Sequence, residues 1–86
     1  MDHFCETLAR LKTKSDIRNF LKDLLNRQER IMLIRRLLIA DMLISGKSHR
    51  EIRQKLKAGF PTISRVDRWL NFGRGGYETA LKTIKK

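Results

Sequence analysis

The sequence has few residues of the types that build covalent, metal or catalytic sites. Its 86 residues include one cysteine, Cys5, and two histidines, His3 and His49. A single cysteine excludes an internal disulfide and a zinc site built on cysteines. The histidines, expected at the surface, and the cysteine are scattered, and no pair of carboxylates stands out. We therefore predict that the protein is not an enzyme and uses no metal or cofactor.

Long apolar runs and secretion signals are also lacking. No uninterrupted apolar stretch approaches the roughly 18 residues that a membrane helix needs. The first ten residues mix acidic and basic side chains and contain no apolar signal-peptide core. The lone thiol suits a reducing compartment. These absences predict a cytoplasmic protein without a membrane partner.

Acidic residues are scarce relative to basic ones. The chain has 9 Asp and Glu against 20 Lys and Arg, which gives a net charge of +11 at pH 7. Residues 47–74 alone carry eight basic and two acidic side chains. A field of this sign attracts polyanions and makes their binding salt-dependent. Any small basic protein has solvated lysines, but the helical pattern beneath this charge favours nucleic acid as the partner.

Residues 48–71 follow the pattern helix, turn, helix. Ser48 precedes Glu51 by three residues, which is the spacing of a capping box at the start of a helix. The turn contains Gly59, which can adopt a positive φ without strain. Pro61 suits the first turn of the second helix because a missing N–H costs nothing there. The pattern predicts a helix-turn-helix unit, whose second helix can enter a DNA major groove.

A rotation of about 100° per residue divides the second of these helices into two sides. Ile63, Val66 and Leu70 cluster on one side and are expected to face the core, so the opposite side would face the groove. Arginine can bond a guanine edge with two hydrogen bonds, and apolar side chains can contact a thymine methyl. The predicted contacts near bases are Arg50, Arg53, Phe60, Pro61, Ser64, Arg65 and Arg68. The predicted phosphate contacts are Lys55, Lys57 and Thr62.

The rest of the chain also shows helical periodicity. Apolar stripes that begin at Phe4, Ile17 and Tyr77 predict amphipathic helices, and Ser15 is the expected N-cap of the second one. No β-hairpin signal is present. The sequence therefore predicts one all-α domain over residues 1–86, with about six helices and the helix-turn-helix in its centre.

One helix, spanning residues 31–44, is apolar nearly all the way round. Asn26 and Glu29 have the spacing of a capping box at its start, and Gly46 supplies its end. Such a helix must be buried on most sides, and a chain this short offers few partners for it. We therefore predict a homodimer with this helix at its centre. The predicted dimer core consists of Ile31, Leu33, Ile34, Leu37, Leu38 and Met42.

These segments resemble a known family. Residues 24–70 resemble the Trp repressor superfamily, and the run ISRVDRWLNFGRGGY at residues 63–77 is similar to its YerC/YecD subfamily. The resemblance implies an all-α, intertwined homodimer that reads double-stranded DNA with a helix-turn-helix and regulates transcription.

The resemblance also raises the question of a ligand. The Trp repressor holds tryptophan between two arginines, and Arg35 and Arg65 stand at the matching positions. However, Val66 replaces the glycine that leaves space for the indole, and Trp69 replaces a pocket serine. Both changes add bulk where tryptophan would lie, so we predict that this chain does not bind it.

The main hypothesis is a homodimeric, sequence-specific DNA-binding regulator of transcription, most simply a repressor. One alternative is a sensor of a small molecule other than tryptophan, with Arg35 and Arg65 gripping its carboxylate. The other is a nucleic-acid-binding protein that is driven by charge and indifferent to sequence.

Overall fold

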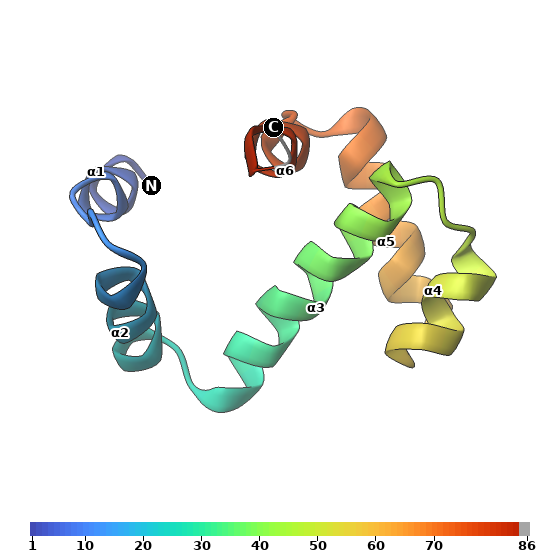
Figure 1. Ribbon diagram of the computed structural model, residues 1–86, viewed down its shortest axis with the longest axis horizontal. Helices are drawn as coiled ribbons and strands as arrows, with labels where there is room; N and C mark the ends of the chain where they lie inside the picture. The colour runs from blue at the N-terminus through green and yellow to red at the C-terminus, as the bar shows by residue number, and fades with distance from the viewer. Residues whose placement is uncertain (85–86) are drawn as a thin grey trace. The chain divides into compact units, whose positions relative to one another are not determined.

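The computed structural model describes residues 1–84, and their side chains as far as Leu81. The described residues form α-helices and no strand (Figure 1). The helices are α1 (Asp2–Ala9), α2 (Lys14–Leu24), α3 (Arg27–Ile44), α4 (His49–Leu56), α5 (Phe60–Phe72) and α6 (Gly76–Ile84). The prediction of an all-α chain with about six helices is confirmed.

Helices α1 and α2 belong to a compact unit that comprises Met1–Ile31. The rings of Phe4 and Phe20 join the two helices, with their centroids 6.3 Å apart. The N-cap of α2 is Thr13, whose hydroxyl accepts a hydrogen bond from the amide of Asp16 at 3.0 Å. The prediction of Ser15 as this cap is wrong, because Ser15 already lies inside the helix.

Both ends of α3 have the caps that the sequence predicts. The side chain of Asn26 accepts from the amide of Glu29, and the side chain of Glu29 accepts from the amide of Asn26, both at 2.9 Å. This reciprocal pair is a capping box. At the other end Gly46 has a φ of 88°, and the amides of Gly46 and its successor donate to the carbonyls of Leu43 and Met42. That pattern is a Schellman motif, which ends the helix at its glycine.

A second compact unit begins at Met32 and contains the buried core. Helix α5 contacts both α4 and α6 there. Ile63 and Val66 of α5 are fully buried and Leu70 is partly buried, so the predicted core side of this helix is confirmed. The buried residues are Ile39, Ala40, Ile52, Ala58, Ile63, Val66 and Leu81.

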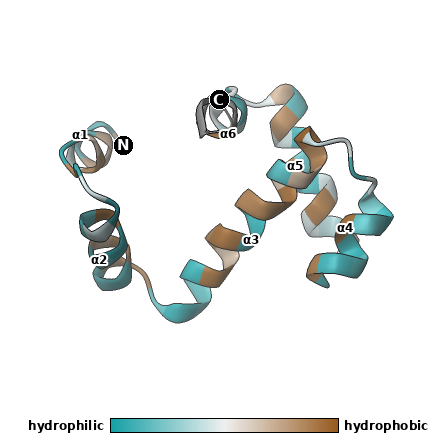
Figure 2. Cartoon of the chain, viewed as in Figure 1, coloured by the Kyte–Doolittle hydropathy of each residue, from teal (hydrophilic) through white to brown (hydrophobic). Residues whose placement is uncertain are grey.

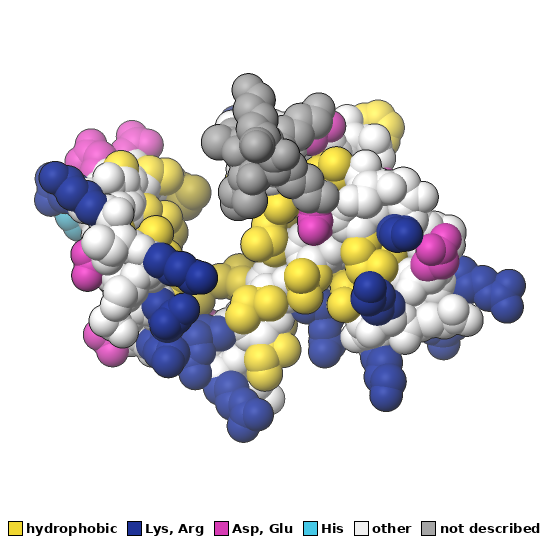
Figure 3. Space-filling view, viewed as in Figure 1, with side chains coloured by type: hydrophobic (Ala, Val, Ile, Leu, Met, Phe, Trp, Pro, Cys, Tyr) yellow, Lys and Arg dark blue, Asp and Glu magenta, His cyan; other side chains and the backbone are white. Residues whose placement is uncertain are grey.

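Much of the apolar surface of α3 is exposed in the single chain. Hydrophobic colour recurs along the whole helix in Figure 2, and yellow side chains lie open on its surface in Figure 3. Ile34 is 58% exposed, whereas Met42 packs against the core of its own chain. The other predicted dimer-core residues are also exposed, namely Ile31, Leu33, Leu37 and Leu38. The homodimer itself stays a prediction.

Candidate nucleic-acid interface

The start of α4 is set by a capping box. The hydroxyl of Ser48 accepts from the amide of Glu51 at 3.1 Å, and the carboxylate of Glu51 accepts from the amide of Ser48 at 3.4 Å. The predicted cap is therefore confirmed. Because residues three and four apart share a face of a helix, this start aligns Arg50 with Arg53 and Gln54.

The turn after α4 depends on a left-handed lysine. Lys57 has φ 55° and ψ 30°, and its amide donates to the carbonyl of Arg53 at 2.8 Å. Gly59 has φ −71° and ψ 150°, so the expected positive φ lies at Lys57 and not at Gly59. The left-handed region costs a residue with a Cβ about 1 kcal/mol or more. Such strain is often retained at functional positions, and Lys57 is a predicted phosphate contact.

The strain at Lys57 leads to a test of stability against binding. The substitution Lys57→Gly is expected to raise the free energy of unfolding by up to about 1 kcal/mol, because glycine adopts a positive φ without a steric penalty. The same change should weaken DNA binding, since one positive charge is lost. Urea denaturation and DNA titration measure the two effects. Lys57→Ala is the matched control, which loses the charge but keeps the Cβ. Equal free energies of unfolding for Lys57→Gly and Lys57→Ala would contradict backbone strain at Lys57.

A hollow of about 620 Å³ lies at this turn. It brings together four of the predicted DNA contacts, which are Arg50, Arg53, Lys57 and Phe60. The guanidinium carbon of Arg53 lies 4.5 Å from the centroid of the Phe60 ring. Gln54 also lines the hollow, although it was not among the predicted DNA contacts. Its spacing of four from Arg50 was the available signal.

A second hollow of about 430 Å³ lies along the exposed side of α5. Its lining residues are Pro61, Ser64, Arg65 and Arg68, which are all exposed. They are the residues that the helical rotation assigned to the side opposite Ile63 and Val66. The structure therefore brings this group together, and its contact with DNA stays a prediction.

Two predicted phosphate contacts lie apart from these groups. Lys55 lines a different hollow, together with Met42 and Lys47. Thr62 is partly buried, and its amide donates to the carbonyl of Gly59 at 3.1 Å. Its amide is therefore already used within the first turn of α5, which leaves the hydroxyl as the group for a phosphate.

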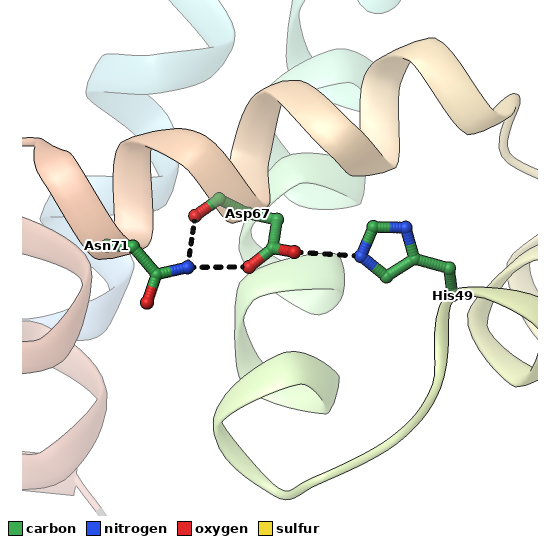
Figure 4. A network of polar contacts seen from close by, with 3 residues as sticks. All are labelled: His49, Asp67 and Asn71. Carbon is green, nitrogen blue, oxygen red and sulfur yellow. Dashed lines mark hydrogen bonds and ion pairs between the residues drawn. The ribbon is translucent and has the colours of Figure 1, made fainter.

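A polar network joins the first turn of α4 to the middle of α5 (Figure 4). His49 Nε2 donates to Asp67 Oδ2 at 2.8 Å. Asn71 Nδ2 donates to Asp67 Oδ1 and to the carbonyl oxygen of Asp67, both at 2.8 Å. The side chains of His49 and Asp67 are 37% and 36% exposed, so His49 is not the free surface residue that the sequence suggested. The network connects α4 to α5 outside the buried core.

Removal of the Asp67 carboxylate should weaken the connection between α4 and α5. We expect Asp67→Ala to lower the free energy of unfolding by about 1–2 kcal/mol, because two side-chain hydrogen bonds are lost at a partly exposed site. Asp23→Ala on α2 removes the same charge from an exposed position and serves as the control. Urea denaturation of both variants measures the difference. Equal losses would show that the network contributes nothing beyond charge.

Comparison with known proteins identifies the family. Residues 1–85 match the family model described as Trp repressor protein. The chain belongs to the Trp repressor family. It is 35% identical over 86 residues to the uncharacterized protein YerC of Bacillus subtilis, a match that covers all of this chain and 83% of YerC. The family resemblance predicted from residues 24–77 is thus confirmed.

Solved structures of similar proteins confirm the Trp repressor-like fold. A TrpR-like protein from Eubacterium eligens has a TM-score of 0.91 and 28% sequence identity, over 98% of this chain and 87% of the other. A proposed Trp repressor from Staphylococcus aureus has a TM-score of 0.92 and 30% identity, over 98% of this chain and 84% of the other. The Trp repressor family is not a family of enzymes, so the prediction of no enzymatic activity is confirmed.

The family resemblance assigned two arginines of this chain, Arg35 and Arg65, to a ligand. Arg35 is exposed on α3 and Arg65 is exposed on α5. It is Arg36 that lies over Trp69, with its guanidinium carbon 5.7 Å from the ring centroid. Val66 is fully buried. Val66 is thus packed within the chain, whereas Trp69 is 42% exposed and contacts Arg36.

The part of the chain that the structure describes contains neither a metal-binding cluster nor a membrane-spanning helix. No group of three or more His, Cys, Asp or Glu side chains there could hold a metal ion. None of the described helices combines the length and the apolar character needed to cross a membrane.

Proposed function

We propose that this protein is a cytoplasmic regulator of transcription that binds a specific sequence of double-stranded DNA as a homodimer. The observation that carries the proposal is the division of α5 into two sides. Ile63 and Val66 are fully buried, while Ser64, Arg65 and Arg68 are exposed on the other side. A helix anchored in this way can enter a major groove and offer its arginines to base edges.

The hollow at the turn supports the same proposal through charge. Arg50, Arg53 and Lys57 are exposed and line one concave surface beside the start of α5. Basic side chains on both sides of a reading helix bond the DNA phosphates and orient the helix in the groove. Each phosphate neutralised releases counterions, so the affinity should fall steeply as salt is added.

The homodimer is supported by the surface of α3. Its six apolar residues between Ile31 and Leu38 are each 42–58% exposed. Exposed apolar surface of this kind marks an interaction site. A second copy is the occupant we propose, because a two-fold dimer carries two reading helices. Two copies of α5 about 34 Å apart would fit successive major grooves of a near-palindromic site.

Selection of bound duplexes from a random pool tests the proposal. We expect enrichment of a near-palindromic sequence that binds at least about 10³-fold more tightly than random DNA at physiological salt. Competition with random duplexes gives this ratio. Equal affinity for selected and random DNA would overturn the proposal and favour a charge-driven binder without sequence preference.

We expect calorimetric titration with tryptophan to give no saturable heat at micromolar concentrations. The physical reason is that buried Val66 and the Trp69 ring beneath Arg36 stand at positions where the family resemblance implies space for the indole. Saturable micromolar binding would contradict this expectation.

A thermal-shift screen against carboxylate metabolites tests the alternative that the protein is a sensor of a small molecule other than tryptophan. A ligand that binds the folded state raises Tm.

A further inference from the structure

We infer that Arg53 and Phe60 form one reading unit, which recognises a DNA step where a guanine neighbours a pyrimidine with a 5-methyl group. This inference rests on the proposed function and narrows it to one sequence feature. It starts from a contact between two helices that are separated by the turn. The guanidinium carbon of Arg53, on α4, lies 4.5 Å from the ring centroid of Phe60, the first residue of α5.

Both partners of this contact are open to a ligand. Phe60 as a whole residue is 42% exposed although its ring lies against the Arg53 side chain, and Arg53 itself is exposed. Both line the hollow of about 620 Å³ at the turn. The remaining basic residues of the hollow, Arg50 and Lys57, can bond phosphates without an aromatic neighbour. The stacked pair therefore needs an explanation beyond charge.

The spacing of the pair matches the spacing of bases. An arginine that bonds the O6 and N7 of guanine lies level with that base pair. Successive base pairs are about 3.4 Å apart along the helix. If the contact runs along the DNA axis, a ring centred 4.5 Å from the guanidinium carbon lies near the level of the neighbouring base pair. Phe60 would thus meet the groove edge of the base next to the guanine.

The chemistry of that groove edge indicates which base lies next to the guanine. The apolar group that base pairs present in the major groove is the C5-methyl of thymine. A 5-methylcytosine carries the same group at the same position. An exposed phenyl ring gains by covering a methyl group and has no hydrogen bond to offer a polar edge. The ring also restricts the guanidinium, which lowers the entropy lost when the planar fork bonds guanine.

The test uses the full-length protein and the duplex selected from the random pool. Each thymine is replaced in turn by deoxyuridine, which lacks the methyl, and each guanine by 7-deazaguanine, which lacks the N7 acceptor. We expect one adjacent pair of sensitive positions in each half-site. Loss of the methyl should weaken binding about 4-fold. Loss of the guanine acceptor should weaken binding roughly 10-fold.

Protein variants assign each effect to its side chain. At the step that Arg53 and Phe60 are proposed to read, Phe60→Ala should abolish the sensitivity to deoxyuridine. Arg53→Lys should abolish the sensitivity to 7-deazaguanine at the same step, because lysine lacks the planar fork. Arg18→Lys, on an exposed position of α2, is the matched control and should keep both sensitivities. Circular dichroism checks the folding of each variant. The DNA substitutions on the unaltered protein decide the matter even if Phe60→Ala unfolds.

A further pair of duplexes distinguishes the two sources of the methyl group. The thymine–adenine pair at the sensitive step is replaced by cytosine–guanine, with or without a 5-methyl on the cytosine. Tighter binding of the methylated duplex by about 4-fold supports recognition of either pyrimidine. A methyl effect on thymine alone supports thymine as the source.

The failure of this inference differs from the failure of the proposed function. A selected duplex without a methyl-sensitive base beside a sensitive guanine would overturn the inference and leave sequence-specific binding intact. The same holds if the deoxyuridine effect survives in Phe60→Ala, or if Arg53→Lys weakens binding equally at every sequence, as a phosphate contact would. A selection that enriches no duplex would overturn the proposed function and this inference with it.

Discussion

The variant Ile34→Glu is expected to sediment as a 10.2 kDa chain, whereas the unaltered protein should have twice that mass. Ile34 is 58% exposed in the single chain, and a substitution at such a position would be nearly neutral if the chain acted alone. If α3 lies at the centre of a homodimer, two carboxylates per dimer enter apolar surroundings. We expect the Kd of the dimer to rise at least roughly 100-fold, because an unpaired buried charge costs several kcal/mol.

Loss of the dimer should also remove specific DNA binding, because one chain reaches only one half-site. Analytical ultracentrifugation and DNA titration measure the two effects. Gln28→Glu adds the same charge at an exposed position near the start of α3 and should leave both properties unchanged. Circular dichroism shows whether the variant chain still folds, since some dimers have no stable monomer. A variant that remains dimeric at micromolar concentration would exclude α3 from the interface.

Features that depend on neighbouring residues could be predicted from the sequence. The capping boxes at Ser48 and Asn26 were both predicted, because a cap and its partner are three residues apart. The cap of α2 was not, since Thr13 and Ser15 are both good caps and stand two residues apart. Only the backbone decides between them: Thr13 is extended and accepts from the amide of Asp16.

The turn between α4 and α5 was predicted, but its left-handed residue was predicted wrongly. A turn that contains Gly59 was predicted, and glycine is the residue that adopts a positive φ with the least steric cost. The left-handed residue is nevertheless Lys57, because α4 ends there and the chain must reverse before Gly59. Sequence propensity ranks residues for a conformation, but the end of the helix decides which residue must adopt it.

Contacts between α4 and α5 could not be predicted from the sequence. His49 and Asp67 are 18 residues apart, and Arg53 reaches Phe60 across the turn. Arg53 and Phe60 were each predicted as DNA contacts, but neither pair was predicted, because only the packing of α5 on α4 brings the partners together. The exposed side of α5 could be predicted because helical rotation separates it from Ile63 and Val66. The hollow at the turn could not.

The substitution Arg65→Ala should weaken binding to the selected duplex at least roughly 30-fold. Arg65 is exposed beside Ser64 and Arg68 on the side of α5 that we propose faces the groove. Each arginine bonded to a guanine contributes about 1–3 kcal/mol of discrimination. A dimer loses this contact at both half-sites. Binding to random duplexes should fall only a few-fold, because there the arginine contributes its charge alone. Parallel titrations of the two duplexes at one salt concentration measure the difference.

Two further variants separate charge from geometry at this position. Arg65→Lys keeps the charge but loses the planar fork, so it should show most of the loss on the selected duplex and little on random DNA. Lys55→Ala removes a predicted phosphate contact and should weaken both duplexes by a similar factor, with a shallower salt dependence. If Arg65→Ala behaved like Lys55→Ala, Arg65 would contact only phosphate. The reading of base edges would then depend on the other predicted contacts, among them Arg53 and Phe60 at the turn.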